Sequence, residues 1–434
     1  MRKYAVLLTF WCLAFGVGLV SQPAVKSASV SMNRCNSGTD SKVWMRKGKR
    51  IFTAETPEVL AVFVYKEGEL MDDIKYMRRA LELARMAEGD TSPNPMVGAV
   101  ITDSSGKIVG EGYHHKAGQP HAEINALAAA GDKAKGATVY VTLEPCSHYG
   151  RTGPCCEALI KAGVKKVVSA VTDPNPLVAG RGLNRLREAG IEVVNGVCED
   201  EARKLNEKFF FWITHKRPFV SLKYAMTLDG KIAADGGDSK WITGAEARTY
   251  AHYLRKTHDA VIVGKNTVLQ DDCELTTRMV EGKNPVRIVL DSKCSLPVNS
   301  KILNGEARTI VAVGENPLLS NLNALKLLKN VEIIKLPEHD GKLDLNALMK
   351  YLAEQEITSL LVEGGSEVHG AFLDAGFAER VYAFIAPKII GGRNALAPVG
   401  GNGCKDMGKA LRLTDIEYKE LGCDLLITGR TERD

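Results

Sequence analysis

The hydrophobic and polar positions of the chain become regular from Asp72 onward. Apolar residues recur at helical spacing from Ile74 to Ala84, which predicts an amphipathic helix over 72–88. Apolar runs at 97–101 and 108–113 predict two strands, and the polar segment 103–106 between them predicts a hairpin turn. The pattern then predicts helices at 121–130, 156–161 and 185–189, one long helix from 200 toward 212, and strands at 138–143, 166–171 and 191–194. This alternation of strands and helices is typical of a layered α/β domain.

The series is interrupted at 215–218, His-Lys-Arg-Pro, and a second α/β series follows. Its predicted strands lie at 219–225, 260–263, 286–290, 309–313, 331–334, 359–362, 380–385 and 425–428. No internal repeat relates the two halves. We therefore expect one domain over 71–216 and a second over 217–434.

Residues 1–70 form an extension without convincing periodicity in 30–70. Arg2 and Lys3 precede an uncharged apolar run at 5–20 and small residues at 24–29, a pattern that resembles a secretory signal peptide. The run is shorter than the roughly 20 residues that a membrane span needs. We favour a start site placed too far upstream, with translation beginning at Met71 and the enzyme in the cytoplasm. Export or targeting through the signal-like segment is the alternative.

Composition narrows the class of protein. The 434 residues suffice for two domains, and 45% hydrophobic with 25% charged residues is typical of a globular protein without stable membrane association. A net charge of +5 without a dense basic run does not require a nucleic-acid partner, and 6% aromatic residues offer few stacking platforms for a strand. The ten cysteines are scattered, which favours reduced thiols and a metal site over a disulfide scaffold.

The first half contains a set of metal-ligand residues. His121 is followed by Glu123, then by Cys146, and after eight residues by Cys155. One His and two Cys give Zn²⁺ three protein ligands and leave the fourth position for water, as in a catalytic site. Glu123 is suited to general acid–base work rather than to ligation. Cys156 is the alternative third ligand, since only one of the adjacent cysteines is expected to reach the metal.

A non-catalytic module held together by zinc is a rival interpretation. A purely structural zinc site is usually closed by a fourth ligand, and Glu123 beside His121 argues against that use. The residues therefore predict a zinc-dependent deaminase.

These residues resemble the cytidine deaminase superfamily, whose common form has two residues between the cysteines. The longer string TLEPCSHYGRTGPC at 142–155 is similar to the deaminase domain of the bifunctional riboflavin-biosynthesis family RibD, as are SPNPMVG at 92–98, GYHHKAGQPHAE at 112–123 and DPNPLVAGRG at 173–182. The resemblance implies that the pyrimidine and its ribose phosphate are bound by Asn94, His114, Ser147, His148 and Arg151. The alternative for Asn94, which lies between two prolines, is a turn.

In the second half the clearest local feature is LLVEGGS at 360–366, a strand that leads into glycines and a helix. Such a turn lets the backbone approach a phosphate, and the helix N-terminus offers N–H groups. A Gly-Gly pair alone is weak, and a simple strand-to-helix turn explains it equally well.

Longer strings in this half resemble the reductase domain of the same family. They are KYAMTLDGKI at 223–232, SKWIT at 239–243, GKNTVLQDD at 264–272 and LVEGG at 361–365, with Cys273 where the family usually has proline. The resemblance implies a fold similar to dihydrofolate reductase and NADPH as cofactor. It implies a cofactor site formed by Ala225, Trp241, Thr267, Asp271, Gly365, Ser366, Glu367, Val368, His369, Gly370 and Ala371. The implied substrate-facing residues are Ser239, Arg255, Leu275, Arg278 and Glu363, with the two arginines paired on the ribose phosphate.

The family resemblance therefore implies a homo-oligomeric bifunctional enzyme acting on a small phosphorylated pyrimidine. The first domain is expected to deaminate 2,5-diamino-6-ribosylamino-4(3H)-pyrimidinone 5′-phosphate with zinc. The second is expected to reduce the ribosyl group of the product with NADPH, giving 5-amino-6-(5-phosphoribitylamino)uracil.

Overall fold

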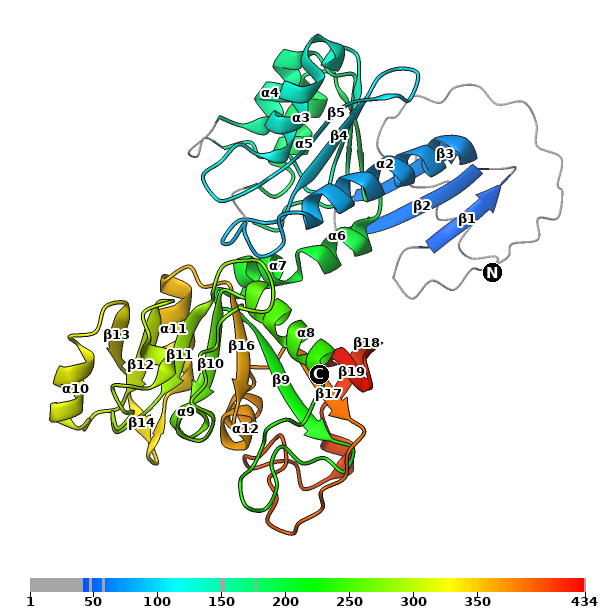
Figure 1. Cartoon of the computed structure of the whole chain (residues 1–434). Helices are drawn as coiled ribbons and strands as arrows, with labels where there is room; N and C mark the ends of the chain where they lie inside the picture. The colour runs from blue at the N-terminus through cyan, green and yellow to red at the C-terminus, as the bar shows by residue number, and fades with distance from the viewer. Residues whose placement is uncertain (1–41, 47–48, 57–58, 149–152, 176–177, 433–434) are drawn as a thin grey trace. The chain divides into compact units, whose positions relative to one another are not determined.

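In a computed structural model the chain divides into two compact units, Met1–Met71 and Asp72–Asp434. The structure describes residues 42–46, 49–56, 59–148, 153–175 and 178–432, so the signal-like run at 5–20 lies outside the described residues. Figure 1 shows the elements along the chain.

The first unit contains an antiparallel sheet that the sequence pattern did not predict. Its strands are β1 (Lys42–Arg46), β2 (Lys49–Thr56) and β3 (Val59–Lys66), paired in that order. The lack of convincing periodicity in 30–70 therefore did not reveal these strands. The segment VLAVFVYK of β3 is a nearly continuous apolar run without alternation, which the periodicity test misses although its β-branched and aromatic residues favour strands.

The second unit begins with a five-stranded mixed sheet of order β5-β4-β6-β7-β8. Strand β4 (Gly98–Thr102) is antiparallel to β5 (Ile108–Tyr113) and to β6 (Thr138–Val141), whereas β6, β7 (Lys166–Ser169) and β8 (Glu192–Asn195) are parallel. The helices are α2 (Glu67–Arg85), α3 (Ala122–Ala130), α4 (Cys155–Ala162) and α5 (Arg181–Glu188), with the short helix η1 (Gly131–Ala134).

Two glycines show that helices cover both faces of this sheet. A Cβ at Gly98 would lie 2.0 Å from the Ala80 carbonyl oxygen, so α2 packs directly on β4. A Cβ at Gly112 would lie 2.4 Å from the Ala126 nitrogen, so α3 packs as closely on β5. Gly98 pairs with Tyr113, and successive residues of a strand point to opposite faces. The two helices therefore cover opposite faces, which confirms the layered α/β fold.

The long helix expected from residue 200 toward 212 is two helices, α6 (Glu199–Leu205) and α7 (Glu207–His215), and that prediction was wrong. Asn206 separates them, and its buried side chain accepts a hydrogen bond from the Met96 N–H and donates one to the Met96 carbonyl, both at 2.8 Å. Asparagine readily leaves helical geometry when its side chain can bind backbone groups.

Beyond 217 the chain forms a nine-stranded sheet of order β13-β12-β11-β10-β16-β9-β17-β19-β18. Neighbouring strands from β13 to β17 are parallel to each other, whereas β19 is antiparallel to both β17 and β18. The strands are β9 (Phe219–Thr227), β10 (Ala260–Gly264), β11 (Val286–Leu290), β12 (Thr309–Val313), β13 (Val331–Lys335), β16 (Ser359–Gly364), β17 (Arg380–Ala386), β18 (Arg412–Leu421) and β19 (Asp424–Glu432). A separate hairpin pairs β14 (Glu338–His339) with β15 (Lys342–Leu343).

Two hydrophobic cores lie on the two faces of this sheet. Ile262 packs in one core and its neighbour Val261 in the other. The first core contains residues of α11 (Leu345–Glu354) and α12 (Ser366–Asp374), and the second contains residues of α8 (Ala245–Lys256), α9 (Lys265–Asp271) and α10 (Leu319–Leu325). Burial on both faces explains why these parallel strands are nearly continuous apolar runs. Short helices η2 (Lys301–Leu303) and η3 (Met407–Lys409) complete this part.

Strand β18 was not predicted. Most of its residues are exposed, and it runs along the antiparallel edge of the sheet, so its sequence RLTDIEYKEL lacks a buried apolar face. The other long strands lie where the pattern placed them, and β11 and β12 have the predicted bounds.

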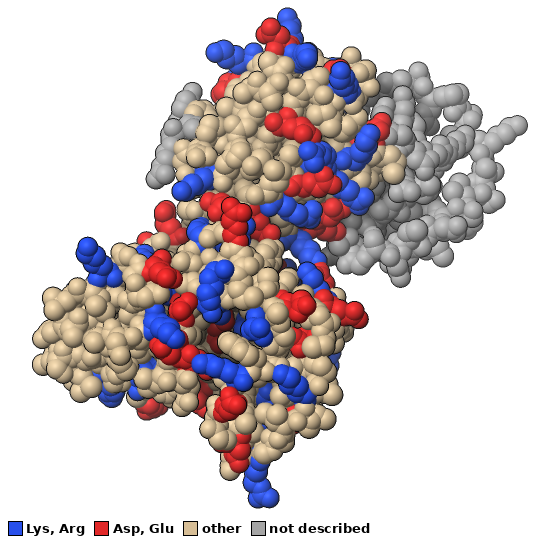
Figure 2. Space-filling model, in the orientation of Figure 1, with Lys and Arg blue, Asp and Glu red and all other residues tan. Residues whose placement is uncertain are grey.

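Two observations concern membrane-spanning helices and surface charge in the described part of the chain. No helix among the described residues is long and apolar enough to cross a membrane. On the face shown in Figure 2, basic and acidic side chains are interspersed over the described residues and do not form a continuous basic band.

We expect Asn206→Ala to destabilise the first α/β domain by roughly 1–3 kcal/mol, because it leaves the buried N–H and carbonyl of Met96 without their partner. The shift of the urea midpoint measures this effect. Asn184→Ala is the control, since Asn184 is exposed and its side chain accepts only from Arg187. Equal midpoints for the two variants would contradict the role given to Asn206.

Candidate active sites

Three metal-ligand residues of the first α/β domain converge at the carboxyl end of β6. His121 is the N-cap residue of α3, Cys155 is the first residue of α4, and Cys146 follows the end of β6. Their ligand atoms all lie within 4.8 Å of one another. The His121 Nδ1 lies 3.6 Å from the Cys146 Sγ and 3.3 Å from the Cys155 Sγ. The structure thus brings together the three residues that the sequence singled out.

The electrostatics of this cluster favour a thiolate at Cys146. Hydrogen bonding from the Cys155 thiol and from His121 lowers the pKa of Cys146 to about 4. The hydrogen bond to Cys146, together with burial, raises the pKa of Cys155, so the proton that the two sulfurs share stays on Cys155. The Cys155 N–H at the start of α4 also donates to the Cys146 Sγ at 3.4 Å. Helix N-termini stabilise such negative charge.

Glu123 lies in the first turn of α3 and is almost fully buried at 3% exposure. Burial raises the pKa of its carboxyl to about 7, and the negative charge on Cys146 contributes to the same shift. A carboxyl that titrates near neutral pH can both accept and donate a proton.

The donor chemistry fits a zinc ion. One imidazole nitrogen and two sulfurs are ligands that zinc prefers, and three protein ligands leave one position open. Among the described residues the cluster contains Cys155 and not its neighbour Cys156, whose backbone N–H donates to the Cys146 carbonyl at 3.2 Å. Binding a metal would remove the proton that Cys155 retains without one.

Two of the five residues predicted to bind the pyrimidine and its ribose phosphate lie next to this cluster. The Asn94 Nδ2 is 3.1 Å from the His114 Nε2, and the His114 ring meets the His121 ring edge-on with centroids 5.3 Å apart. His114 is buried and its Nδ1 lies 3.1 Å from the Pro120 carbonyl, so the ring is held firmly. His115, by contrast, is exposed.

The other three candidates follow Cys146 in the chain. Ser147 is half-buried and His148 is exposed. Arg151 lies outside the described residues.

In the second domain the carboxyl ends of β10 and β16 lie side by side and each leads into a helix. Strand β10 ends at Gly264 before α9, and β16 ends at Gly364 before α12. Gly365 between β16 and α12 has φ +76°, which glycine adopts without strain. A Cβ at Gly365 would lie 3.3 Å from the Thr267 Oγ1, so the two turns are in contact. Open α/β sheets bind their ligands at such a position.

The cofactor candidates lie in β9, in the segment 239–243, in α9 and along α12. Ala225 is half-buried in β9, Trp241 is 61% exposed, and Asp271, the last residue of α9, accepts a hydrogen bond from Ser239 at 3.0 Å. His369 is buried with both ring nitrogens near carbonyl oxygens, of Pro398 and of Val362, at 2.9 and 3.1 Å. Its side chain therefore anchors α12 inside the protein. The predicted residues of the first turns of α12 are Ser366, Glu367, Val368, Gly370 and Ala371.

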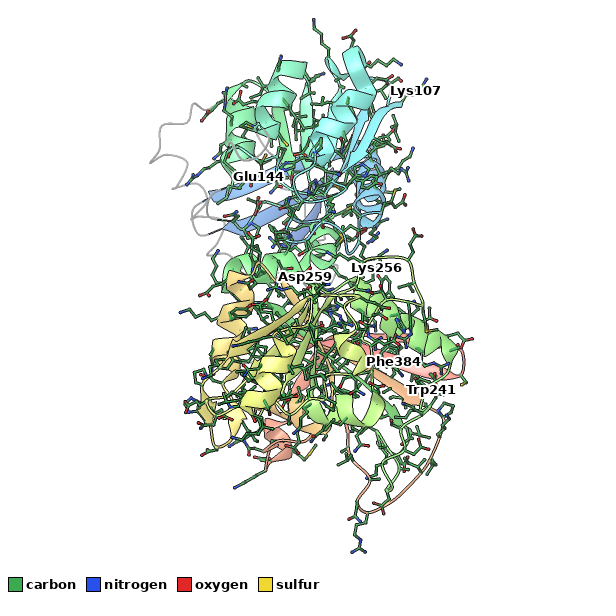
Figure 3. The ribbon with its side chains drawn as sticks, turned by 60° about the vertical axis from the view of Figure 1, so that its left-hand side comes forward. Lys107, Glu144, Trp241, Lys256, Asp259 and Phe384 are labelled. Atoms are coloured by element: carbon green, nitrogen blue, oxygen red, sulfur yellow. The ribbon has the colours of Figure 1, made fainter. Side chains whose placement is uncertain are left out.

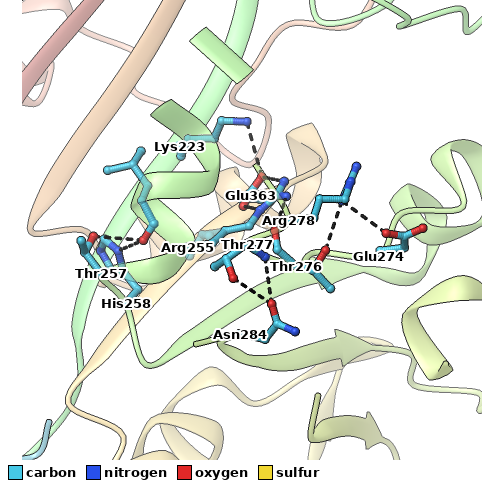
Figure 4. A network of polar contacts seen from close by, with 12 residues as sticks. Lys223, Arg255, Thr257, His258, Glu274, Thr276, Thr277, Arg278, Asn284 and Glu363 are labelled. Atoms are coloured by element: carbon cyan, nitrogen blue, oxygen red, sulfur yellow. Dashed lines mark hydrogen bonds and ion pairs between the residues drawn. The ribbon is translucent and has the colours of Figure 1, made fainter. Parts of the chain in front are cut away.

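A buried ion-pair network contains two of the residues predicted to face the substrate, Arg255 and Glu363 (Figure 4). The Glu363 carboxylate in β16 accepts a hydrogen bond from the Arg255 Nη2 at 2.8 Å and another from the Lys223 Nζ at 3.4 Å. Burial opposes ionisation of Glu363, but Arg255 and Lys223 outweigh it and lower the pKa of the carboxyl to about 2. The Arg255 guanidinium is thus already paired, and its Nη1 also donates to the Thr276 carbonyl at 3.2 Å.

This pairing changes the expectation that Arg255 and Arg278 clamp one phosphate. Arg278 keeps 53% of its side chain exposed, and its Nη1 binds the Thr276 Oγ1 at 3.2 Å, so it is the more accessible of the two cations. Leu275, expected to face the substrate, is buried in the second core at φ +52°.

Sequence reasoning gave no role to Lys223, which the network uses. Lys223 opens the string KYAMTLDGKI, but its partner Glu363 lies 140 positions away in sequence. Only the pairing of β9 with β16 brings them together.

Two family models match the chain on either side of residue 217. "Cytidine and deoxycytidylate deaminase zinc-binding region" matches residues 70–171, and "RibD C-terminal domain" matches residues 218–427.

Curated relatives and solved structures match over most of the chain. The chain is 49% identical to the riboflavin biosynthesis protein RibD of Aquifex aeolicus, covering 82% of this chain and 97% of that protein. It is 44% identical to the RibD of Escherichia coli over 74% of this chain and 89% of that protein. The solved structure of Acinetobacter baumannii RibD superposes with a TM-score of 0.76 at 40% identity, covering 84% of this chain and all of that one.

A deaminase/reductase structure from Thermotoga maritima superposes similarly, with a TM-score of 0.73 at 39% identity over 84% of this chain and all of that chain. Sequence identity, family models and structure agree on both halves. The chain belongs to the RibD family of bifunctional deaminase/reductase enzymes of riboflavin biosynthesis.

Proposed function

We propose that this chain deaminates 2,5-diamino-6-ribosylamino-4(3H)-pyrimidinone 5′-phosphate in its first domain and reduces the ribosyl group of the product in its second. The observation that carries the proposal is the convergence of His121, Cys146 and Cys155 around one point with the buried Glu123 beside them. Family membership supports the choice of substrate.

In the deaminase step Zn²⁺ would be held by His121, Cys146 and Cys155, and when bound it lowers the pKa of a water to about 7. Glu123 takes up the proton of the attacking water and delivers it to the ring nitrogen, and a second transfer protonates the departing amine. Its neutral-range pKa suits both directions of transfer. Asn94 and His114 hold the pyrimidine edge, and Ser147, His148 and Arg151 serve the ribose phosphate.

In the reductase step NADPH would lie over the carboxyl ends of β10 and β16, where it supplies a hydride. The first turn of α12 would bind cofactor phosphate through backbone N–H groups, with Thr267 beside Gly365. Ser239 and Arg278 would bind the substrate. Glu363 would hold Arg255 and Lys223 in fixed orientation beside it rather than leave Arg255 as an independent phosphate clamp.

The domain boundary and the setting of the enzyme are part of the proposal. We place the boundary at 216/217, between the end of α7 at His215 and the start of β9 at Phe219. The eight described cysteines are all unpaired, which suits a reducing compartment such as the cytoplasm. Homo-oligomer formation stays a prediction from the family resemblance.

We expect Glu123→Gln to reduce the kcat of deamination by roughly 10²–10⁴-fold, because the amide cannot shuttle a proton. Metal analysis should find the same zinc content as in the wild type, since Glu123 is not among the ligands. Deamination within a few-fold of the wild type would refute the proton-transfer role. Glu157→Gln is the matched control, a partly exposed carboxylate of α4 that pairs with Arg185.

Metal removal should separate the two steps. After dialysis against a chelator, ammonia release from the diaminopyrimidine phosphate should stop while NADPH oxidation with the deaminated intermediate continues, because no zinc-ligand residue lies in the second domain. Mass analysis of the intermediate and product with and without chelator checks this division. Loss of both steps in a protein that stays folded would contradict independent sites.

The buried Glu363 should make stability depend on acid pH. Its folded-state pKa of about 2 is below the ordinary value of 4.5, so its stabilisation is present above pH 4.5 and is lost as pH falls toward 2. At pH 7 we expect Glu363→Gln to cost on the order of 3 kcal/mol, because Arg255 and Lys223 are left buried without their partner.

Urea unfolding of wild type and variant between pH 7 and pH 3.5 measures the difference, which should narrow below pH 4.5. Glu274→Gln is the control, because its pair with Arg278 is more exposed. A difference that stays constant over this range would show that the pKa of Glu363 is the same in the folded and unfolded states.

A further inference from the structure

Glu144 is a buried carboxylate that the proposed chemistry does not use. It lies in the chain between the end of β6 and the ligand Cys146, and it is 4% exposed. Figure 3 labels it in the first α/β domain. Four backbone N–H groups donate to it. Those of Asp173 and Gly180 reach the Oε2 at 3.1 and 2.9 Å, and those of Gly182 and Leu183 reach the Oε1 at 2.9 and 3.3 Å.

These bonds cap helix α5. Gly180 is its N-cap residue and has no side chain to satisfy the free N–H groups of the first turn. The Glu144 carboxylate binds three of them, and the positive end of the helix dipole stabilises its charge. Among the described residues no lysine or arginine forms an ion pair with Glu144, so backbone N–H groups alone neutralise it.

Helix α5 also packs closely on the segment that leads to Cys146. A Cβ at Gly182 would lie 1.9 Å from the Pro145 carbonyl oxygen, so the first turn of α5 touches the backbone one residue before Cys146. The Glu144 backbone N–H donates to the Val171 carbonyl at 2.9 Å. Backbone and side chain of Glu144 therefore both bind the chain that leaves β7.

The segment held in this way lies close to the reaction centre. Asp173 is buried and interacts electrostatically with Glu144, His148 and the Cys146 sulfur. The Cys146 carbonyl in turn accepts the Cys156 N–H of α4, the helix that carries Cys155. Displacement of α5 would thus reach both cysteine ligands.

We propose that Glu144 is a positioning residue of the deaminase centre. Its carboxylate binds the first turn of α5 and Asp173 to the Pro145–Cys146 segment, and so fixes the Cys146 ligand and the buried Asp173 near it. The inference rests on the proposed zinc-dependent deamination.

A glutamine at this position tests the role of the carboxylate. Two carboxylate oxygens accept all four N–H groups, whereas the amide of Glu144→Gln offers one oxygen and turns an NH₂ group toward the remaining donors. We expect kcat/KM for deamination to fall roughly 10–100-fold and zinc release to a chelating dye to quicken by a similar factor. NADPH oxidation with the deaminated intermediate should be unchanged, which shows that the reductase domain is folded.

Glu157→Gln is the matched control. Its carboxylate binds Arg185 of the same helix α5, but 41% of its side chain is exposed, so both deamination and zinc release should stay within about two-fold of the wild type. Deamination and zinc release in Glu144→Gln that match this control would overturn the proposal. If the wild type itself shows no zinc-dependent deamination, the proposed function fails instead.

Hydrogen–deuterium exchange of the wild type tests the contact without a variant and without activity. The Gly180, Gly182 and Leu183 amides should exchange as slowly as those of β6, because a buried carboxylate protects them. Rapid exchange of these amides in the folded enzyme would also overturn the proposal.

Discussion

The deaminase centre depends on two helix N-termini that meet at the carboxyl end of one strand. His121 caps α3, Cys155 begins α4, and Cys146 follows β6. This geometry brings three ligand atoms within 4.8 Å, and the N–H of Cys155 at the start of α4 donates to the Cys146 Sγ. A thiolate is costly to bury without such compensation. The hydrogen bonds from Cys155 and His121 therefore favour a thiolate at Cys146, the form in which a cysteine binds a metal.

The reductase domain has a similar geometry at the position proposed for its cofactor. The ends of β10 and β16 adjoin, and each strand turns directly into a helix. Gly365 adopts φ +76° at one turn and contacts Thr267 from the other. The N-terminus of a helix at such a turn suits the phosphate of an anionic cofactor. Both proposed sites therefore lie where strands lead into helices.

The sequence predicted the features that depend on the type and burial of neighbouring residues in the chain. The apolar runs of β11 and β12 have the observed bounds because both faces of each strand are buried. The order of His121, Glu123, Cys146 and Cys155 identified the metal cluster because those residue types are rare together. The choice of Cys155 over Cys156 also agrees with the described cluster, since the first residue of α4 points to His121.

What sequence could not predict depends on distant partners. The break at Asn206 comes from its bonds to Met96, 110 positions away. The exposed strand β18 exists because it pairs with β19, and Leu275 is a core residue because its neighbours from other elements enclose it. Arg255, which the family resemblance pairs with Arg278 on the ribose phosphate, also binds Glu363, 108 positions later. In each case a partner distant in the sequence determines the local structure or the contacts of the residue.

Glu144 and Glu363 are bound inside the protein in two different ways, with different consequences. Glu363 accepts from the side-chain cations Arg255 and Lys223, and so fixes the orientation of those two side chains. Glu144 accepts from four backbone N–H groups, and so fixes the backbone of the segments that donate them. The first arrangement therefore suits the orientation of charged side chains, and the second suits the support of a metal ligand whose backbone must not move.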